Sequence, residues 1–119
     1  KVDEHAVIKT LIMESEKDKF IVLMHGDREV STKELARQIG TKKAEPCQVE
    51  VAHKLTGYMF GGTSPFGVRK EMKVYVEKSI MTLPKIYING GKRGFIIEIN
   101  PADMLNVLDI EEVEVAIEK

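Results

Sequence analysis

The sequence predicts an α+β fold, with a curled, mixed and mostly antiparallel sheet and flanking helices. The first observation behind this prediction is the length, because 119 residues fit one domain. The second is the series of short apolar runs bounded by turn residues, which predicts about six or seven strands. The third is the order of the elements, since the expected helices do not alternate strictly with the strands as in a parallel α/β fold.

The apolar runs that predict strands are separated by charged or glycine-rich turns. Residues 6–13 and 20–26 flank a short charged segment and are expected to pair as a hairpin. Residues 41–47 are expected to form an extended link, and residues 59–70 hold the densest turn region of the chain. The other expected strands are residues 72–78, 85–89, 94–99 and 113–117.

Three segments carry the start and stop signals of helices. The first begins with Ser31 as a cap and Glu34 three residues later, which together make a capping box, and it ends at Gly40. The last begins with Asn100 as a cap and Pro101 at the first helical position. The three helices are expected at residues 31–40, 46–58 and 100–108, and the inward residues of the second are Val49, Ala52 and Leu55, ahead of Gly57.

Composition and charge exclude several classes of protein. The apolar fraction of 43% and the charged fraction of 31% are ordinary for a globular protein, and no apolar run is long enough to cross a membrane. A formal net charge of −1 argues against a histone-like nucleic-acid binder but allows a local basic patch. A single cysteine and the lack of a secretion signal predict the reducing cytoplasm. Cations in the middle of the chain are Lys42, Lys43, Lys54, Arg69, Lys70, Lys92 and Arg93.

Lys9 is the first candidate for a functional side chain. It lies inside the apolar stretch AVIKTLIM, where strand alternation puts it on the same face as Val7 and Leu11. One interpretation is a lysine on the solvent face of an edge strand, because a buried, unpaired ammonium group is unfavourable. The other is a fixed positive charge in a pocket, suited to a phosphate, a carboxylate or a polarised carbonyl.

Two glycine-rich loops are the next candidates. The segment GGTSPFG (61–67) allows a ligand to approach the backbone, or it is a pair of tight turns, and it lacks the residue spacing of a P-loop. The segment NGGKRG (89–94) offers glycine N–H groups and two cations to an anion. Alternatively, it is a solvated hairpin tip whose cations protect a sheet edge. Nearby aromatic residues, expected to pack in the loops or to floor a pocket, are Tyr58 and Phe60.

The sequence predicts no metal site, no cofactor and no catalytic triad. His5, His25 and His53 are scattered and form no metal-ligand spacing with one another or with a cysteine. Cys47 precedes an expected helix, whose N-terminus would lower the pKa of the thiol, so a catalytic thiol stands as the less favoured alternative. The nucleophile elbow of serine hydrolases is missing.

Five motifs, taken in order, resemble the YbaK/EbsC family of aminoacyl-tRNA deacylases, which are relatives of the editing domain of bacterial prolyl-tRNA synthetases. The motifs are VIKTLI, LARQIGTKKAE, TGYMFGGTSPFG, KIYINGGKRGFIIEI and PADMLNVL. They extend from Ala6 to Leu108. The resemblance implies the YbaK-type editing-domain fold for a single domain over residues 1–119. It also implies hydrolysis of the ester that joins a wrong amino acid to tRNA, typically in Cys-tRNA(Pro).

The resemblance further implies roles for individual residues. Lys9 falls on the family's essential lysine and would hold the terminal adenosine or polarise the ester carbonyl. Gly90 and Gly91 are expected to donate N–H groups to the developing oxyanion. The attacking group would be the thiol of a cysteinyl substrate or a bound water. The implied partners are tRNA, whose phosphates would meet the mid-chain cations, and prolyl-tRNA synthetase. The expected substrate contacts are Thr10, Tyr58, Gly61, Gly62, Ser64, Asn89, Lys92 and Arg93.

Three features depart from the family pattern. Asn89 stands where serine is common, and Ile96 stands where many members carry aspartate, so both bear on substrate choice. Family members also have a segment before the KTL strand, and the chain is expected to lack it together with one edge of the pocket. Two further hypotheses therefore stay open: a catalytically weak module that binds tRNA or a synthetase, and a small-anion or nucleotide-binding domain.

Overall fold

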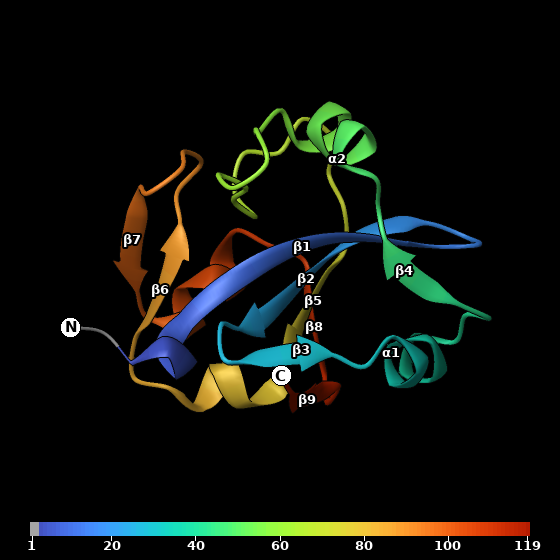
Figure 1. Cartoon of the computed structure of the whole chain (residues 1–119). Helices are drawn as coiled ribbons and strands as arrows, with labels where there is room; N and C mark the ends of the chain where they lie inside the picture. Colours follow the sequence, from blue (N-terminus) through green and yellow to red (C-terminus); the bar gives the residue numbers. More distant parts are fainter. Residues whose placement is uncertain (1–2) are drawn as a thin grey trace.

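A seven-stranded mixed sheet forms the body of the protein in the computed structural model, which describes residues 3–119 (Figure 1). Its strand order is β7-β6-β1-β2-β5-β8, with β4 paired to part of β1, and β3 and β9 form a separate two-stranded sheet. The strands are β1 (Val7–Ser15), β2 (Lys19–His25), β3 (Arg28–Val30), β4 (Ala44–Pro46), β5 (Val74–Glu77), β6 (Ile86–Asn89), β7 (Ile96–Ile99), β8 (Ile110–Val113) and β9 (Ala116–Glu118). The helices are α1 (Thr32–Ile39), α2 (Val49–Thr56) and the 3-10 helices η1 (Glu4–Ala6), η2 (Lys78–Thr82) and η3 (Pro101–Asn106).

The pairing of the strands confirms a mixed sheet. The expected hairpin forms between β1 and β2, which pair antiparallel from Ile8–His25 to Glu14–Lys19. The pairs β1–β4, β6–β7 and β3–β9 are also antiparallel, whereas β1–β6, β2–β5 and β5–β8 are parallel. Parallel and antiparallel pairs are thus more evenly balanced than the sequence predicts, because the strand at residues 110–113 joins β5 in parallel.

The outer edge of β1 is interrupted. Val7 and Ile8 pair with β6, and residues 13–15 pair with β4, but within residues 3–119 no strand pairs with the stretch between them. The amide of Cys47 bridges part of the break by donating to the carbonyl of Ile12 at 3.0 Å. Because backbone direction alternates along a strand, the backbone groups of Thr10 point to the same open edge. Figure 1 looks onto this edge, with β6 and β7 at one end of β1 and β4 at the other.

Two apolar cores lie on the two faces of the sheet. On one face, Ile8 and Ile12 pack with Ile86 and Ile88, and residues of α2 cover them. On the other face, Met13 packs with buried residues of β2 and α1. Figure 1 shows α2 and α1 on opposite sides of β1. Nearly every residue of β2 is buried, so the sheet's centre is dry on both faces.

The helix α1 forms as its end signals predict. The hydroxyl of Ser31 accepts the Glu34 amide at 3.2 Å, and Gly40 closes the helix in the left-handed conformation with φ 78°. The other half of the expected capping box is absent, because the Glu34 carboxylate instead accepts from Arg37 and Gln38. The Ser31 amide has another acceptor, since it donates to the Val115 carbonyl at 2.8 Å.

Several expected elements need correction. The segment after Asn100 is a 3-10 helix and not an α-helix, although the Asn100 side chain caps it by accepting the Ala102 amide at 3.0 Å. Val49, expected to face inward, is 52% exposed, while Ala52 and Leu55 do pack on the core. The strands β3 and β8 were not expected, because both are short and charged. In the described part of the chain, no helix combines the length and apolar character needed to cross a membrane.

Candidate functional site

A cavity of about 610 Å³ opens where the edge of β1 is interrupted. Its walls come from both sides of β1: Glu29 of β3 on one side, and Phe60 and Gly61 of the glycine-rich loop on the other. Cys47, which follows β4, and Asn89, which ends β6, stand at its two ends. The volume lies within the range of roughly 300–1,000 Å³ found for small-molecule sites. Its walls are mainly apolar, unlike a phosphate pocket rich in cations.

Lys9 lies on the wall of this cavity and not on a free solvent face. It is partly buried, and it makes no ion pair within residues 3–119. Burial lowers the pKa of the Lys9 ammonium group, and the charge of Lys119 lowers it further, while Glu29 acts in the opposite direction. An ammonium group held in this way keeps its hydrogen-bonding capacity for a ligand.

Thr10, expected as a substrate contact, also lines the cavity. Its hydroxyl oxygen is buried and finds no hydrogen-bond partner among the described residues. Buried hydroxyl groups are normally paired. Because this oxygen has almost no accessible surface, the polar groups that Thr10 offers to the cavity are those of its backbone at the open edge.

The two glycine-rich loops interlock beside the cavity. A Cβ atom on Gly62 would lie 2.7 Å from the backbone nitrogen of Arg93, and one on Gly61 would lie 3.0 Å from the Nε of Arg93. A Cβ atom on Gly91 would lie 2.7 Å from a ring carbon of Tyr58. These distances are shorter than carbon contacts tolerate. The glycines therefore let two loops approach each other, which is a packing reason for both motifs.

The N–H groups of Gly90 and Gly91, which the sequence predicts as donors to an oxyanion, already have acceptors within the protein. The Gly90 amide donates to the Phe95 carbonyl at 2.8 Å. The Gly91 and Lys92 amides both donate to Oδ1 of Asn89, at 2.6 and 3.0 Å, and Nδ2 of Asn89 returns a bond to the Lys92 carbonyl at 2.9 Å. The Asn89 carboxamide thus fills the anion nest that its own loop creates.

Several other expected substrate contacts do not line the cavity. Ser64 is fully buried, and its hydroxyl accepts the Phe66 amide at 3.1 Å, so it holds the loop together. The Tyr58 hydroxyl donates to the Phe66 carbonyl. Gly62 and the glycines of the second loop are packing positions that do not line the cavity. Arg93 does not line it either, but its side chain packs against Gly61, which does. Of the predicted residues, those on the wall are Lys9, Thr10, Gly61 and Asn89.

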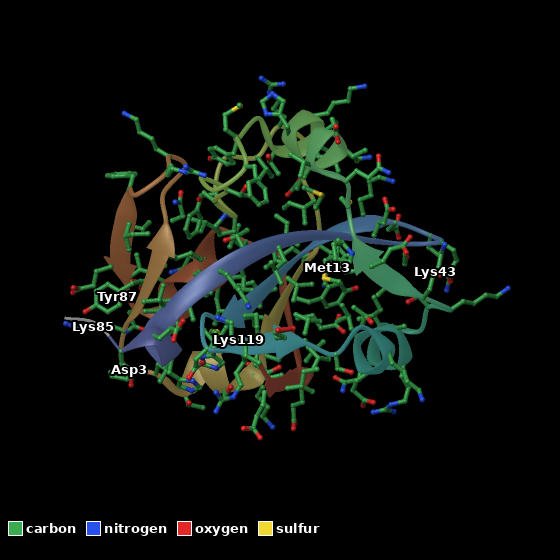
Figure 2. The ribbon with its side chains drawn as sticks, viewed as in Figure 1. Asp3, Met13, Lys43, Lys85, Tyr87 and Lys119 are labelled. Atoms are coloured by element: carbon green, nitrogen blue, oxygen red, sulfur yellow. The ribbon has the colours of Figure 1, made fainter. Side chains whose placement is uncertain are left out.

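The expected phosphate contacts are dispersed. Lys43 projects from the far end of β4, remote from Tyr87 (Figure 2), where it pairs with Glu45 at 3.7 Å. The amides of Lys42 and Lys43 are bound by Glu16 at 2.9 and 3.2 Å. Arg69 packs along Gly57. The cations therefore do not form one basic patch at the cavity.

Two further residues on the wall carry chemistry: Glu29, which the sequence does not single out, and Cys47, its less favoured candidate nucleophile. Glu29 is a carboxylate from β3, which pairs with β9. Cys47 was weighed as a nucleophile, but burial and the nearby Glu14 carboxylate raise the pKa of its thiol to about 11. The Cys47 sulfur lies 3.6 Å from Oε1 of Glu14, to which it donates. This residue is a neutral thiol at physiological pH and not an activated nucleophile.

Two of the three histidines that are scattered in the sequence, His5 and His25, meet outside the cavity. The rings of His5 and His25 stack with centroids 3.7 Å apart, and Nδ1 of His5 contacts the Asp27 carboxylate at 3.0 Å. Nδ1 of the buried His25 donates to the His5 carbonyl at 2.6 Å, and Nε2 contacts the Ser79 hydroxyl at 2.7 Å. Three side chains able to ligate a metal, His5, His25 and Asp27, thus come together. Both nitrogens of His25 are nevertheless already bonded within the protein.

We expect the protein to lose stability when the pH falls from 7.5 to 5.5, because of His25. Burial lowers the pKa of this imidazole below its ordinary value of 6.5. The unfolded chain therefore binds more protons, so the stabilisation is complete above pH 6.5 and is lost as the pH falls through 6.5 toward the folded-state pKa. Urea denaturation of His25→Gln should give a flatter pH profile of the unfolding free energy. The exposed His53, changed to Gln, is the control that should keep the wild-type profile.

The comparisons with known proteins agree on one family. The model of the family described as "Aminoacyl-tRNA editing domain" matches residues 1–107. An Enterococcus faecalis protein, provisionally named Cys-tRNA(Pro)/Cys-tRNA(Cys) deacylase EbsC, is 30% identical over 115 residues, which cover 96% of this chain and 70% of the relative. A proline–tRNA ligase of Streptococcus equi subsp. zooepidemicus is 24% identical over 95% of this chain, but the match covers only 19% of that enzyme.

The solved structures agree with the predicted fold. The crystal structure of a provisionally identified trans-editing enzyme for prolyl-tRNA synthetase superimposes with a TM-score of 0.89 at 19% identity. The match covers 99% of this chain and 73% of that one. At this identity the likeness supports the fold, and the family model supports the family. The chain therefore belongs to the aminoacyl-tRNA editing domain family, which is the YbaK/EbsC relationship that its ordered motifs predict.

Proposed function

We propose that this protein is a trans-editing deacylase that hydrolyses the ester of mischarged tRNA, with Cys-tRNA(Pro) as its substrate. The observation that carries the proposal is Lys9, an ammonium group without an ion pair on the wall of a mainly apolar cavity of about 610 Å³. An aminoacyl ester needs stabilisation of the negative charge that develops on its carbonyl oxygen. A cation in a poorly solvated cavity supplies this stabilisation more strongly than one in water.

The proposed mechanism assigns the donors differently from the sequence analysis. Lys9 binds the ester carbonyl. The amides of Gly61 and Thr63 donate to the developing oxyanion in place of those of Gly90 and Gly91, because both residues line the cavity and their amides have no acceptor in residues 3–119. The backbone of Thr10, which faces the open edge of β1, contacts the terminal ribose. A water, or the thiol of a cysteinyl substrate, attacks the carbonyl carbon, and the ester bond to the ribose oxygen breaks as that oxygen takes the proton that the attacking group loses. Water gives the free amino acid, and the thiol gives a cyclic thioester that water then opens. We also propose that the protein works in the cytoplasm beside prolyl-tRNA synthetase.

A panel of mischarged tRNAs tests this function. We expect the protein to release cysteine from Cys-tRNA(Pro) faster than spontaneous hydrolysis does, measured as loss of labelled aminoacyl-tRNA with time. Release of cysteine alone indicates attack by the substrate thiol, whereas release of alanine or serine as well indicates water. Pro-tRNA(Pro) is the control that should remain intact. Absence of release from every member of the panel would contradict the proposal.

A second function is favoured by one observation. Asn89 occupies the anion nest with its own carboxamide, which removes two N–H groups from any substrate. This arrangement is what a catalytically weak module that binds tRNA or a synthetase would have. A tRNA-binding titration run beside the deacylation time course separates the two functions, because binding without turnover selects the module.

A further inference from the structure

Glu29 supplies the negative charge in the cavity. Within residues 3–119, the wall contains one carboxylate, Glu29, and one cationic side chain, Lys9. The two act on each other electrostatically without forming an ion pair. The cavity is therefore bipolar, with separated positive and negative groups on an otherwise mainly apolar wall.

The position of Glu29 is set by the backbone and not by a partner for its carboxylate. It is the central residue of β3 and lies opposite Ile117 of β9 in the antiparallel ladder. Its neighbour Val30 packs against the buried core. The Glu29 side chain itself makes no hydrogen bond or ion pair to the described residues, and it is exposed at the cavity mouth. A ligand can reach it without breaking an existing contact.

We propose that Glu29 binds the α-ammonium group of the aminoacyl ester. The inference rests on the proposed function, since this ester places an ammonium group one carbon away from the carbonyl that Lys9 binds. Two opposite charges on the wall then fix the direction in which the aminoacyl group enters. An amide at the same nitrogen carries no charge and no ammonium donors, so peptidyl-tRNA and N-formylated tRNA are rejected. The protein thereby edits aminoacyl-tRNA whose α-amino group is free, and it spares elongating or initiating tRNA.

Two matched substrates and two matched variants test the proposal. The substrates are Cys-tRNA(Pro) and 3-mercaptopropionyl-tRNA(Pro), which keeps the ester and the thiol but lacks the amino group. The variants are Glu29→Gln and the control Glu112→Gln, which removes the same charge from β8 at the opposite edge of the sheet. Rates are divided by spontaneous hydrolysis of each substrate, because the ammonium group also activates the ester. Circular dichroism and thermal unfolding check that each variant is folded.

For Glu29→Gln, we expect kcat/KM on Cys-tRNA(Pro) to fall about tenfold, the typical effect of losing a charge-assisted hydrogen bond. The rate on 3-mercaptopropionyl-tRNA(Pro) should stay within about twofold of wild type, and Glu112→Gln should match wild type on both substrates. An equal loss on both substrates would show that Glu29 only supports the structure, and unchanged rates on both would show that it has no part in binding. Either result overturns this inference while the deacylase function stands. A wild-type protein inactive on both substrates, and on the panel above, overturns the function itself.

Discussion

Replacement of Lys9 by methionine is expected to lower kcat/KM for deacylation by about 100-fold or more, the typical effect of removing one group that stabilises an oxyanion. Methionine keeps much of the apolar stem of lysine and removes only the ammonium group. The Lys9 ammonium group is partly buried and has no ion pair in the described part of the chain, so its removal relieves a desolvation penalty. The folded state should therefore be as stable as wild type, or slightly more stable.

The measurement combines a deacylation time course with a thermal melt of the same sample. Lys85→Met is the matched control, because Lys85 is exposed, pairs with Glu98 at 3.2 Å and lies outside the cavity (Figure 2). A surface pair of this kind contributes about 0–1 kcal/mol, so the control should retain wild-type activity. Full activity in Lys9→Met would contradict the proposed mechanism. Equal losses of activity in both variants would indicate a general effect of charge on tRNA binding.

Replacement of Gly62 by alanine is expected to have the second largest effect, through the interlocked loops. The new methyl group would lie 2.7 Å from the backbone nitrogen and 2.9 Å from the backbone carbon of the facing loop, at Arg93 and Lys92. Backbone atoms in a hairpin cannot move aside as a flexible side chain can. Forced overpacking of this kind destabilises a protein by about 1–3 kcal/mol. The displaced loop carries Asn89 away from the cavity wall, so activity should fall further than stability alone explains.

Gly40→Ala separates these two effects. Gly40 ends α1 with φ 78°, and no atom lies within 4 Å of the position that a Cβ would take. Alanine there is strained by backbone conformation alone, far from the cavity. We expect the two variants to be destabilised to a similar extent in urea, while only Gly62→Ala loses activity at a denaturant concentration of zero. Wild-type activity in Gly62→Ala would mean that the loop contact does not position the site.

Local signals explain which parts of the fold could be predicted from the sequence. The ends of α1 were predicted because Ser31 and Gly40 act on their own neighbours in the chain. The strand β8 was missed because its pairing with β5 is parallel and distant, and the two glutamates inside it resemble a charged tail. Val49 was misplaced because a short helix that packs at the rim of a cavity leaves an apolar side chain partly uncovered.

The residues of the candidate site also differ in whether the sequence reveals their role. Lys9 was visible because a lysine inside an apolar strand conflicts with its surroundings, and such conflicts often mark function. Glu29 sits in a segment that resembles any charged turn, and only the folded chain brings it across from Lys9. The occupied nest is an Asx-turn, in which Asn89 accepts the amide two residues on, so asparagine ahead of two glycines carried a signal that the prediction of free amides did not use.

Because the edge of β1 is interrupted, the cavity there forms only when segments distant in sequence come together, which happens late in folding. Its walls come from the segments 9–13, 29–32 and 46–63 and from residue 89, so that no short contiguous part of the chain contains it. Contacts between segments so far apart in sequence form only after the loops between them have closed. Catalytic activity therefore reports on completion of the native topology, whereas the β1–β2 hairpin and α1, built from neighbouring residues, report only on its early parts.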